Sequence, residues 1–210
     1  MERDDTGSMT SLQKAKVDVS LENPNLPMPL RFEVSSPETI EKLLSVEDLT
    51  LPPEDDQEKN IVGTIYDQVV SKLREHGFPD IRIIRGNPIV EARDNFDRLL
   101  FPSGNPGRSS TYTRYTDENH VLRTHTSALI PSTFDDIEKK SIDRSTFVLP
   151  GLVYRRDVID PRHLDVFHQI DVWTLQKDSE YGRATRGNLL ELARTIFEAA
   201  CPDAKMIVHE

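Results

Sequence analysis

The sequence of 210 residues contains a single cysteine, Cys201, so it cannot form an intrachain disulfide. Cys201 follows a helical pattern without an obvious basic neighbour, which favours a buried structural thiol over a reactive nucleophile. No apolar run is long enough to cross a bilayer, and the acidic N-terminus lacks the apolar segment of a secretory signal. These features predict a cytoplasmic protein with no membrane partner.

Basic residues are in the minority, with 26 Lys and Arg against 36 Asp and Glu, and the formal net charge is −10. A protein that binds nucleic acid over a broad surface needs clustered cations to neutralise the phosphates, so this class is disfavoured. A local basic site stays open, because the second half of the chain contains Arg155, Arg156, Arg162, Arg183 and Arg186. Solvated strand ends and loops are the alternative explanation of these arginines.

Several chemical signatures are also missing from the sequence. It contains no GxxxxGK[ST] phosphate loop, no Cys/His cluster with metal-ligand spacing and no internal repeat. We therefore predict no metal site built from the side chains of the chain itself. The hydrophobic content of 36% and the charged content of 30% are typical of a rather polar globular protein with one core.

The first part of the chain differs in composition from the rest. Residues 1–56 are rich in Pro, Glu, Asp and Ser, and predict an extended, partly disordered arm packed on a domain formed by residues 57–210. Within this arm, SPETIEKLL predicts one short helix, with Ser35 or Ser36 as its N-cap and Pro37 in its first turn.

Hydrophobic periodicity predicts the secondary structure of much of the domain. Apolar side chains at three- and four-residue spacing indicate helices, and Gly77 is suited to be a C-terminal cap. The elements expected are helices over residues 57–76, 132–140 and 188–200, strands over 81–84 and 205–210, and a loop over 93–108. The first strand is expected to end at Asn87 and Pro88.

The segment from Gly151 to Leu175 has the most informative pattern of the chain. Two alternating runs of β-branched and aromatic residues, Leu152–Arg156 and Val166–Leu175, flank the Asp-Pro pair at Asp160. Because the runs read as strands and the pair breaks the segment between them, we expect an antiparallel hairpin with a long loop.

Alternate residues of a strand point to opposite faces of the sheet. The first strand places Val153, Arg155 and Asp157 on one face, and the second strand places together Phe167, Gln169, Asp171 and Trp173. A planar guanidinium beside an aromatic ring and a Gln-x-Asp pair suits a ligand with a phosphate, a flat ring and an amine. A cross-strand salt bridge on an exposed sheet is an equally open alternative.

The segment from Val121 to Pro131 predicts a third strand, with Arg123, His125 and Ser127 on one side. A Ser–His nucleophile pair is disfavoured, because both side chains point the same way without a third group to orient the base. Hydrogen bonding to a ligand is the preferred interpretation, and a structural histidine is the alternative.

Three segments together resemble a known family. In order, they are GFPDIRIIRGNPIVEARDNFDRLLFPSGNPGR, LRTHTS and GLVYRRDVIDPRHLDVFHQIDV. They are similar to the catalytic core of the phenylalanyl-tRNA synthetase α chain and its single-chain organellar relatives, from Asp56 to Ala200. The resemblance implies an α+β class II aminoacyl-tRNA synthetase fold, in which helices flank an antiparallel β-sheet. It also implies a dimer-type interface, with a second copy or a partner chain, at the helix 57–77 and the Pro88 strand.

The resemblance implies ATP-dependent activation of phenylalanine or a related amino acid to an aminoacyl-adenylate, with ATP and Mg²⁺ as cofactors. tRNA is the implied acceptor, although the acidic net charge gives tRNA binding weak support. Two other functions stay open: a non-catalytic small-molecule-binding paralogue, and a ligase that transfers the amino acid to a non-tRNA acceptor.

The resemblance also implies roles for individual residues. Arg155 resembles the motif 2 arginine that holds the α-phosphate of ATP and the amino-acid carboxylate, which makes it the expected catalytic residue. Phe167 resembles the ring that stacks on adenine. The remaining nucleotide-binding residues implied are Asp157 and His163, and the amino-acid-binding residues implied are His125, Ser127, Gln169 and Asp171.

The sequence departs from the family pattern in three ways. Asp171 stands where the family has Glu, and SSTYTRY follows NPGR where the family has an acidic and aromatic stretch. The sequence stops before the glycine-rich motif 3, so we expect a core that lacks this motif. These departures leave the amino acid and the acceptor open.

Overall fold

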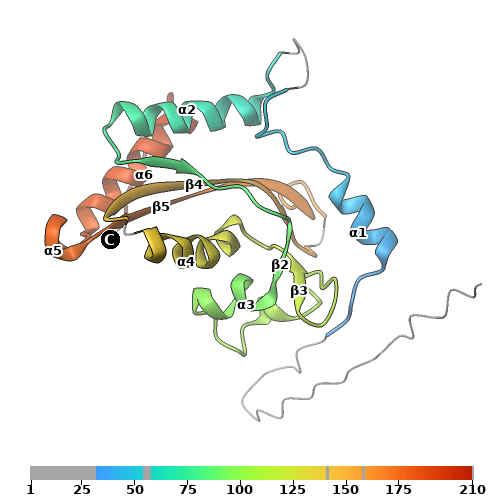
Figure 1. Cartoon of the computed structure of the whole chain (residues 1–210). Coiled ribbons are helices and arrows are strands. Elements are labelled where there is room, and N and C mark those ends of the chain that lie inside the picture. The colour runs from blue at the N-terminus through green and yellow to red at the C-terminus, as the bar shows by residue number, and fades with distance from the viewer. Residues whose placement is uncertain (1–31, 54–57, 141, 158, 210) are drawn as a thin grey trace, which may run out of the picture.

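The computed structural model describes residues 32–53, 58–140, 142–157 and 159–209. The predictions that fall on residues 1–31 and 54–57 lie outside this part. At the centre is the antiparallel hairpin of β4 (Arg144–Tyr154) and β5 (Val166–Gln176), which pair along their whole length (Figure 1). The third strand of the sheet, β1 (Ile81–Ile83), runs parallel to β4 on the other side from β5. The predicted hairpin is therefore confirmed, with β4 beginning earlier than expected.

Helices α2 (Ile61–Glu75) and α6 (Arg186–Ala200) cover one face of this sheet (Figure 1). Their apolar sides meet the strands in one cluster, whose buried members include Val69, Leu73, Val148 and Leu192. Both helices have a capped N-terminus: Asn60 accepts the N–H of Gly63, and Thr185 forms a capping box with Asn188. Because caps and periodicity are local signals, both helices are close to their predicted bounds.

Helix α4 (Ile130–Lys140) packs on the opposite face of the hairpin, below the sheet in Figure 1. It continues from the 3₁₀ helix Thr126–Leu129. The ring of Phe134 lies edge-on to Trp173 with 6.1 Å between their centres, and Phe147 and Ile137 belong to the same cluster. Trp173 is therefore a partly buried residue that packs against the core, although the alternation grouped it with the candidate ligand-binding side chains.

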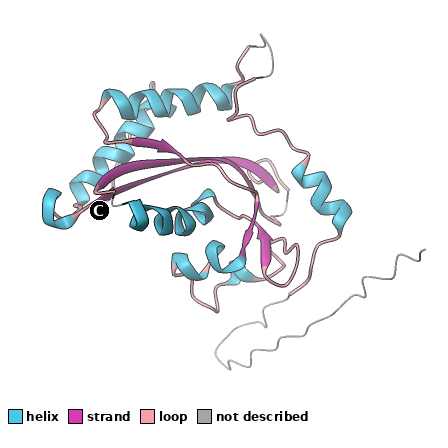
Figure 2. Cartoon of the chain, viewed as in Figure 1, coloured by secondary structure: helices cyan, strands magenta, loops and turns pink. Residues whose placement is uncertain are grey.

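A second, small sheet lies near the loop end of the hairpin, where β4 ends and β5 begins (Figure 2). It consists of the antiparallel strands β2 (Ile89–Glu91) and β3 (His120–Leu122). Helix α1 (Pro37–Leu44) contributes Leu43 to the core cluster there, which contains Leu122 and Leu152. Ser36 caps α1 and Pro37 occupies its first turn, as predicted.

The segment that follows α1 also contacts the hairpin and β1. The backbone N–H of Leu49 donates to Nε2 of His168 over 2.9 Å, and Arg85 donates to the hydroxyl and the carbonyl of Thr50, each over 2.8 Å. These contacts tie part of the N-terminal arm to the sheet. The division of the chain at residue 57 stays a prediction.

Several predicted elements are wrong. The strand expected over residues 121–131 ends at Leu122, and a 3₁₀ helix begins at Thr126 instead. The loop expected over 93–108 contains part of the short helix α3 (Ala92–Asn95) and the 3₁₀ helices Asp97–Leu99 and Pro106–Arg108. Between β5 and α6 the chain also forms the short helix α5 (Asp178–Tyr181).

The end of the chain also differs from expectation. Residues 205–209 form no strand, and Cys201 is exposed instead of buried. Cys201 is the C-cap of α6, so it lies past the last turn that packs on the core. Among the described residues, no helix combines the length and the apolar character that crossing a membrane requires.

Candidate active site

The candidate site begins where the hairpin opens into its loop. Phe167 pairs with Val153 in the hairpin, and Arg155 follows directly after β4. The guanidinium carbon of Arg155 lies 5.1 Å from the centre of the Phe167 ring, a cation–π arrangement. Nε of Arg155 donates to the carbonyl oxygen of Thr124 over 3.0 Å. These two contacts direct the guanidinium, and the described residues leave its terminal nitrogens without a hydrogen bond.

Further along β5, Asp171 is the centre of a hydrogen-bonded cluster. The hydroxyl of Ser127 donates to one carboxylate oxygen, and Nε2 of Gln169 donates to the other over 2.8 Å. Both donors are neutral, so the cluster keeps the negative charge of the carboxylate uncompensated within the described residues. The Oε1 atom of Gln169 is buried and accepts no hydrogen bond there.

His125 lies next to this cluster, at the start of the 3₁₀ helix that contains Ser127. Its ring stacks on Phe101, with 5.5 Å between the ring centres and 9° between the planes. Burial lowers the pKa of His125, and the Asp171 carboxylate partly opposes this shift. Neither ring nitrogen makes a hydrogen bond of ordinary geometry within the described residues, although the backbone of Asn95 lies close enough to raise the pKa of His125 against the effect of burial. The imidazole is therefore neutral at neutral pH.

The unpartnered atoms of this cluster indicate the chemistry of a fitting ligand. A buried polar atom without a hydrogen bond costs free energy, which a ligand with suitable groups would recover. Gln169 Oε1 and the Asp171 carboxylate are acceptors, so they suit an ammonium group, which carries only donors. The guanidinium of Arg155 suits a phosphate or a carboxylate. The arrangement can therefore bind a ligand with an amine and a ligand with a phosphate side by side.

The loop residues His163 and Asp157 are not part of this arrangement. The imidazole of His163 is exposed, and its Nδ1 lies 2.9 Å from the carboxylate of Asp160, which raises the pKa of His163. Asp160 also accepts the backbone N–H groups of Arg162 and His163. Asp157 is half-buried, and no contact joins it to Arg155 or Phe167 in the described part of the chain. Within the described residues, neither Asp157 nor His163 therefore has a hydrogen bond or an ion pair with another predicted site residue outside the loop.

Thr124, Asn95 and Phe101 surround the site but were not predicted to belong to it. The carbonyl oxygen of Thr124 accepts a hydrogen bond from Arg155. The side chain of Asn95 accepts a hydrogen bond from the backbone of Thr124. The ring of Phe101 stacks on the ring of His125. The carbonyl of Thr124 has no sequence signal, because any residue supplies one. Asn95 carried a weak signal, since it directly precedes the buried Phe96 at the head of the predicted loop.

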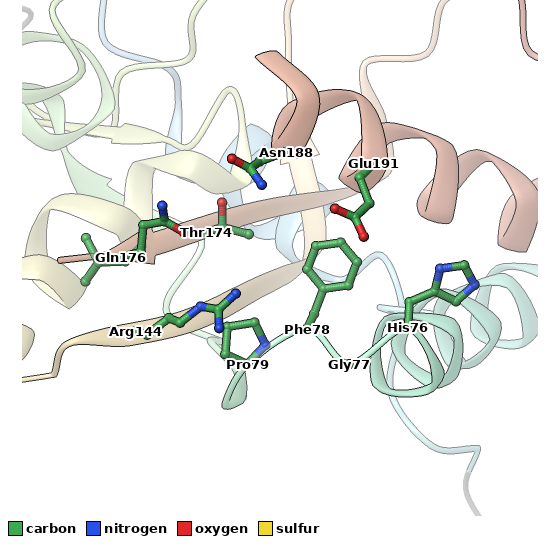
Figure 3. A pocket seen from close by; sticks show the side chains of 10 residues that line it. His76, Gly77, Phe78, Pro79, Arg144, Thr174, Gln176, Asn188 and Glu191 are labelled. Carbon is green, nitrogen blue, oxygen red and sulfur yellow. The ribbon is translucent and has the colours of Figure 1, made fainter. Parts of the chain in front are cut away.

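Two cavities lie outside the candidate site. One of about 470 Å³ opens between the connection from β1 to β2 and helix α4, and its lining includes Arg85, Glu91 and Phe147. The other, of about 80 Å³, lies at the end of the hairpin where β4 begins and β5 ends, away from the candidate site. Phe78 and Glu191 point toward each other there (Figure 3). None of the site residues predicted from the sequence lines either cavity.

Comparison with solved structures supports the fold. The chain is similar to the pyrrolysyl-tRNA synthetase of Desulfitobacterium hafniense, with a TM-score of 0.52 and 16% sequence identity. The alignment covers 78% of this chain and 50% of that protein. This likeness shows the class II synthetase fold, with the antiparallel hairpin and flanking helices described above.

Comparison with known sequences shows the family. The chain is 39% identical over 122 residues to the mitochondrial phenylalanine–tRNA ligase of Saccharomyces cerevisiae, covering 58% of this chain and 26% of that protein. It is 32% identical over 167 residues to the phenylalanine–tRNA ligase alpha subunit of Dictyoglomus thermophilum, covering 76% of this chain and 46% of the subunit. The chain thus spans less than half the length of these two relatives. Because residues 47–206 match the family described as tRNA synthetases class II core domain (F), the chain belongs to that family.

Proposed function

We propose that this chain forms an ATP- and amino-acid-binding core that activates phenylalanine or a related amino acid to its aminoacyl-adenylate for tRNA aminoacylation. The observation that carries the proposal is the adjacency of the Arg155–Phe167 pair to the cluster around Asp171. Thr124 joins the two groups, because its carbonyl binds Arg155 and the next residue is His125. Membership of the class II core domain (F) family supports the same chemistry.

In the proposed nucleotide site, Arg155 binds the α-phosphate of ATP and Phe167 stacks on adenine. A guanidinium forms charge-assisted, often bidentate, hydrogen bonds with phosphate oxygens. One face of the Phe167 ring already contacts the Arg155 guanidinium, so adenine would take the opposite face. His163 and Asp157 would join the site only through a movement of the loop between β4 and β5.

In the proposed amino-acid site, the ammonium group binds Asp171 and the free Oε1 of Gln169. The hydrogen bonds from Ser127 and Gln169 orient the carboxylate for this contact. The neutral ring of His125 adds no positive charge that would repel the ammonium group. Phenylalanine is the amino acid named in the relatives of this chain.

The reaction needs no nucleophilic side chain. A carboxylate oxygen of the amino acid attacks the α-phosphorus of ATP, the bond to the bridging oxygen breaks, and pyrophosphate leaves. The protein contributes position and charge: in this proposal Arg155 contacts both the attacking carboxylate and the α-phosphate. Arg155 is therefore the proposed catalytic residue.

Mg²⁺ is proposed to enter with ATP. Mg²⁺ usually keeps several waters and binds substrate phosphates together with one or two carboxylates. The described residues contain no group of three His, Cys, Asp or Glu side chains placed to hold a metal ion. We therefore propose that the phosphates of ATP carry the metal ion. When bound, the metal ion would neutralise charge on the leaving pyrophosphate.

We propose tRNA as the acceptor, and a dimer-type interface, with a second copy or a partner chain, at α2 and the strand after Pro88. Light scattering coupled to size-exclusion chromatography tests the self-association. A cytoplasmic location is proposed from the sequence, and cell fractionation tests it, because relatives of the chain include mitochondrial proteins.

The proposed activity is tested by amino-acid-dependent exchange of pyrophosphate into ATP, with each of the twenty amino acids. We expect exchange with phenylalanine or another aromatic amino acid, and its loss in Arg155→Ala. Arg194→Ala is the matched control, because Arg194 is exposed on α6 and lies outside the loop that contains His163. ATP binding without exchange for any amino acid would contradict the proposed activity and favour a binding-only paralogue.

A further inference from the structure

Asn95 is a fully buried polar side chain at the end of α3, with 0% of its surface exposed. Both ends of its amide bind the same residue: Nδ2 donates to Oγ1 of Thr124 over 2.9 Å, and Oδ1 accepts the backbone N–H of Thr124 over 3.0 Å. Two hydrogen bonds from one rigid amide fix both the position and the orientation of Thr124.

Thr124 connects Asn95 to two residues of the candidate site. Its carbonyl oxygen accepts the hydrogen bond from Nε of Arg155, and His125 follows it in the chain. On its other side, Arg123 is anchored to β4, because its Nε donates to the carbonyl of Leu152 over 2.8 Å. The carbonyl of Arg123 accepts the backbone N–H of Tyr154 over 3.0 Å. The backbone around Thr124 is thus held by β4 on one side and by Asn95 on the other.

We propose that Asn95 is a positioning residue for the candidate site: it holds Thr124 so that Arg155 and His125 keep the orientation in which they face the ligands. What Arg155 and His125 bind rests on the proposed function, whereas the positioning is a property of the chain alone. Asn95 acts through Thr124, so it is not a catalytic residue.

A purely structural Asn95 would also destabilise the protein when replaced, so stability alone does not distinguish the two roles. The distinguishing quantity is the hydrogen bond from Arg155 to Thr124. It is measured as the solvent exchange rate of the Arg155 Nε–H proton in ¹⁵N NMR spectra, without any ligand. The variant Arg155→Lys, which lacks this group, assigns the signal.

In Asn95→Ala we expect this proton to exchange faster by on the order of tenfold, because Thr124 is no longer held. The control is Asn188→Ala, which removes the two hydrogen bonds that Oδ1 of Asn188 accepts from Thr185 at α6 and no contact with Thr124. In this control, the rate should stay that of the wild-type protein. An unchanged rate in folded Asn95→Ala, or an equal increase in the control, would overturn the proposal.

Thr124→Val carries the test if Asn95→Ala does not fold. This nearly isosteric change removes the Oγ1 acceptor and leaves the bond from the Thr124 N–H to Asn95 Oδ1. We expect faster exchange of the Arg155 proton than in the wild-type protein and in the control. A wild-type rate in Thr124→Val would count against positioning by Asn95.

ATP titrations separate this proposal from the proposed function. If Asn95 acts through Arg155, the double variant Asn95→Ala/Arg155→Ala should bind ATP no more weakly than Arg155→Ala alone. Wild-type ATP affinity in Asn95→Ala would overturn the positioning role while leaving the proposed function intact. Absence of ATP binding by the wild-type chain would contradict the proposed function, and the exchange rates would still decide the role of Asn95.

Discussion

The guanidinium of Arg155 faces the ring of Phe167 at 5.1 Å because the register of the hairpin brings them together. Phe167 pairs with Val153, and Arg155 follows two residues later on the same side of the chain. The contact orients a cation and an aromatic ring toward the open end of the hairpin. Arg155 and Asp171 both act on the buried His125, whose pKa the guanidinium lowers and the carboxylate raises.

Asp171→Asn should weaken the binding of phenylalanine by at least about tenfold, which corresponds to about 1.4 kcal/mol. The reason is that the variant removes the negative charge that is proposed to bind the ammonium group. The same change should lower the pKa of His125 further, because the Asp171 carboxylate raises it in the native protein. Calorimetric titration measures the affinity, and NMR titration measures the pKa.

The control for this prediction is Asp143→Asn. Asp143 pairs with Lys177 near the end of the hairpin away from the candidate site, over 3.2 Å. The Asp143→Asn variant should bind phenylalanine as the wild-type chain does. Wild-type affinity in Asp171→Asn would show that the amine binds elsewhere.

The buried His125 makes stability depend on pH in a defined direction. Burial lowers its pKa in the folded protein, and unfolding restores the ordinary value of 6.5. Below that pH the unfolded chain binds a proton that the folded chain does not, so stability is fully present above about pH 6.5 and declines as the pH falls. Thermal unfolding between pH 5 and pH 8 should therefore show a weaker decline in His125→Gln.

His163 provides the opposite sign within the same molecule. The hydrogen bond with Asp160 raises the pKa of His163, so its contribution is present below about pH 6.5 and is lost as the pH rises through the raised value. His163→Gln should remove a small part of the stability at low pH. Profiles of the two variants that differ from the wild-type profile in the same direction would contradict this assignment.

Gly151 should tolerate no side chain. Its φ is +150°, and a Cβ at this position would overlap Nη2 of Arg123, whose guanidinium is buried. Gly151→Ala should therefore lower the free energy of unfolding by about 1–3 kcal/mol, from backbone strain and displacement of Arg123. Urea denaturation measures the loss.

Gly77→Ala is the matched control for Gly151→Ala. Gly77 has a φ of +73°, but an added Cβ would meet no atom within 4 Å. The control should thus lose only the cost of the left-handed backbone, about 1–2 kcal/mol. Equal or greater destabilisation in Gly77→Ala would show that the Arg123 contact at Gly151 contributes nothing.

Local patterns were enough to predict the elements that support the site. Alternation identified the hairpin and placed Phe167, Gln169 and Asp171 on one face, and capping residues identified α1. These signals are local, because neighbouring residues determine capping and alternation. The face shared by the site residues was therefore visible in the sequence before any tertiary contact was known.

The segment around His125 was mispredicted because distant contacts determine its shape. Its residues are β-branched and alternating, yet the strand ends at Leu122. Asn95, 29 residues earlier, binds both the backbone and the side chain of Thr124, and a 3₁₀ helix follows. As a result Ser127 reaches Asp171, while Arg123 turns away to the carbonyl of Leu152. A pairing over this separation leaves no periodic signal in the sequence.

The Arg155–Phe167 pair is proposed to form a nucleotide site, and a calorimetric titration with ATP and Mg²⁺ measures binding there. We predict that the wild-type chain binds ATP, that Arg155→Ala and Phe167→Ala each bind it at least about tenfold more weakly, and that all three stay folded. Arg194→Ala, on the exposed side of α6, should bind as the wild-type chain does. Unchanged ATP affinity in folded Arg155→Ala and Phe167→Ala would contradict the account.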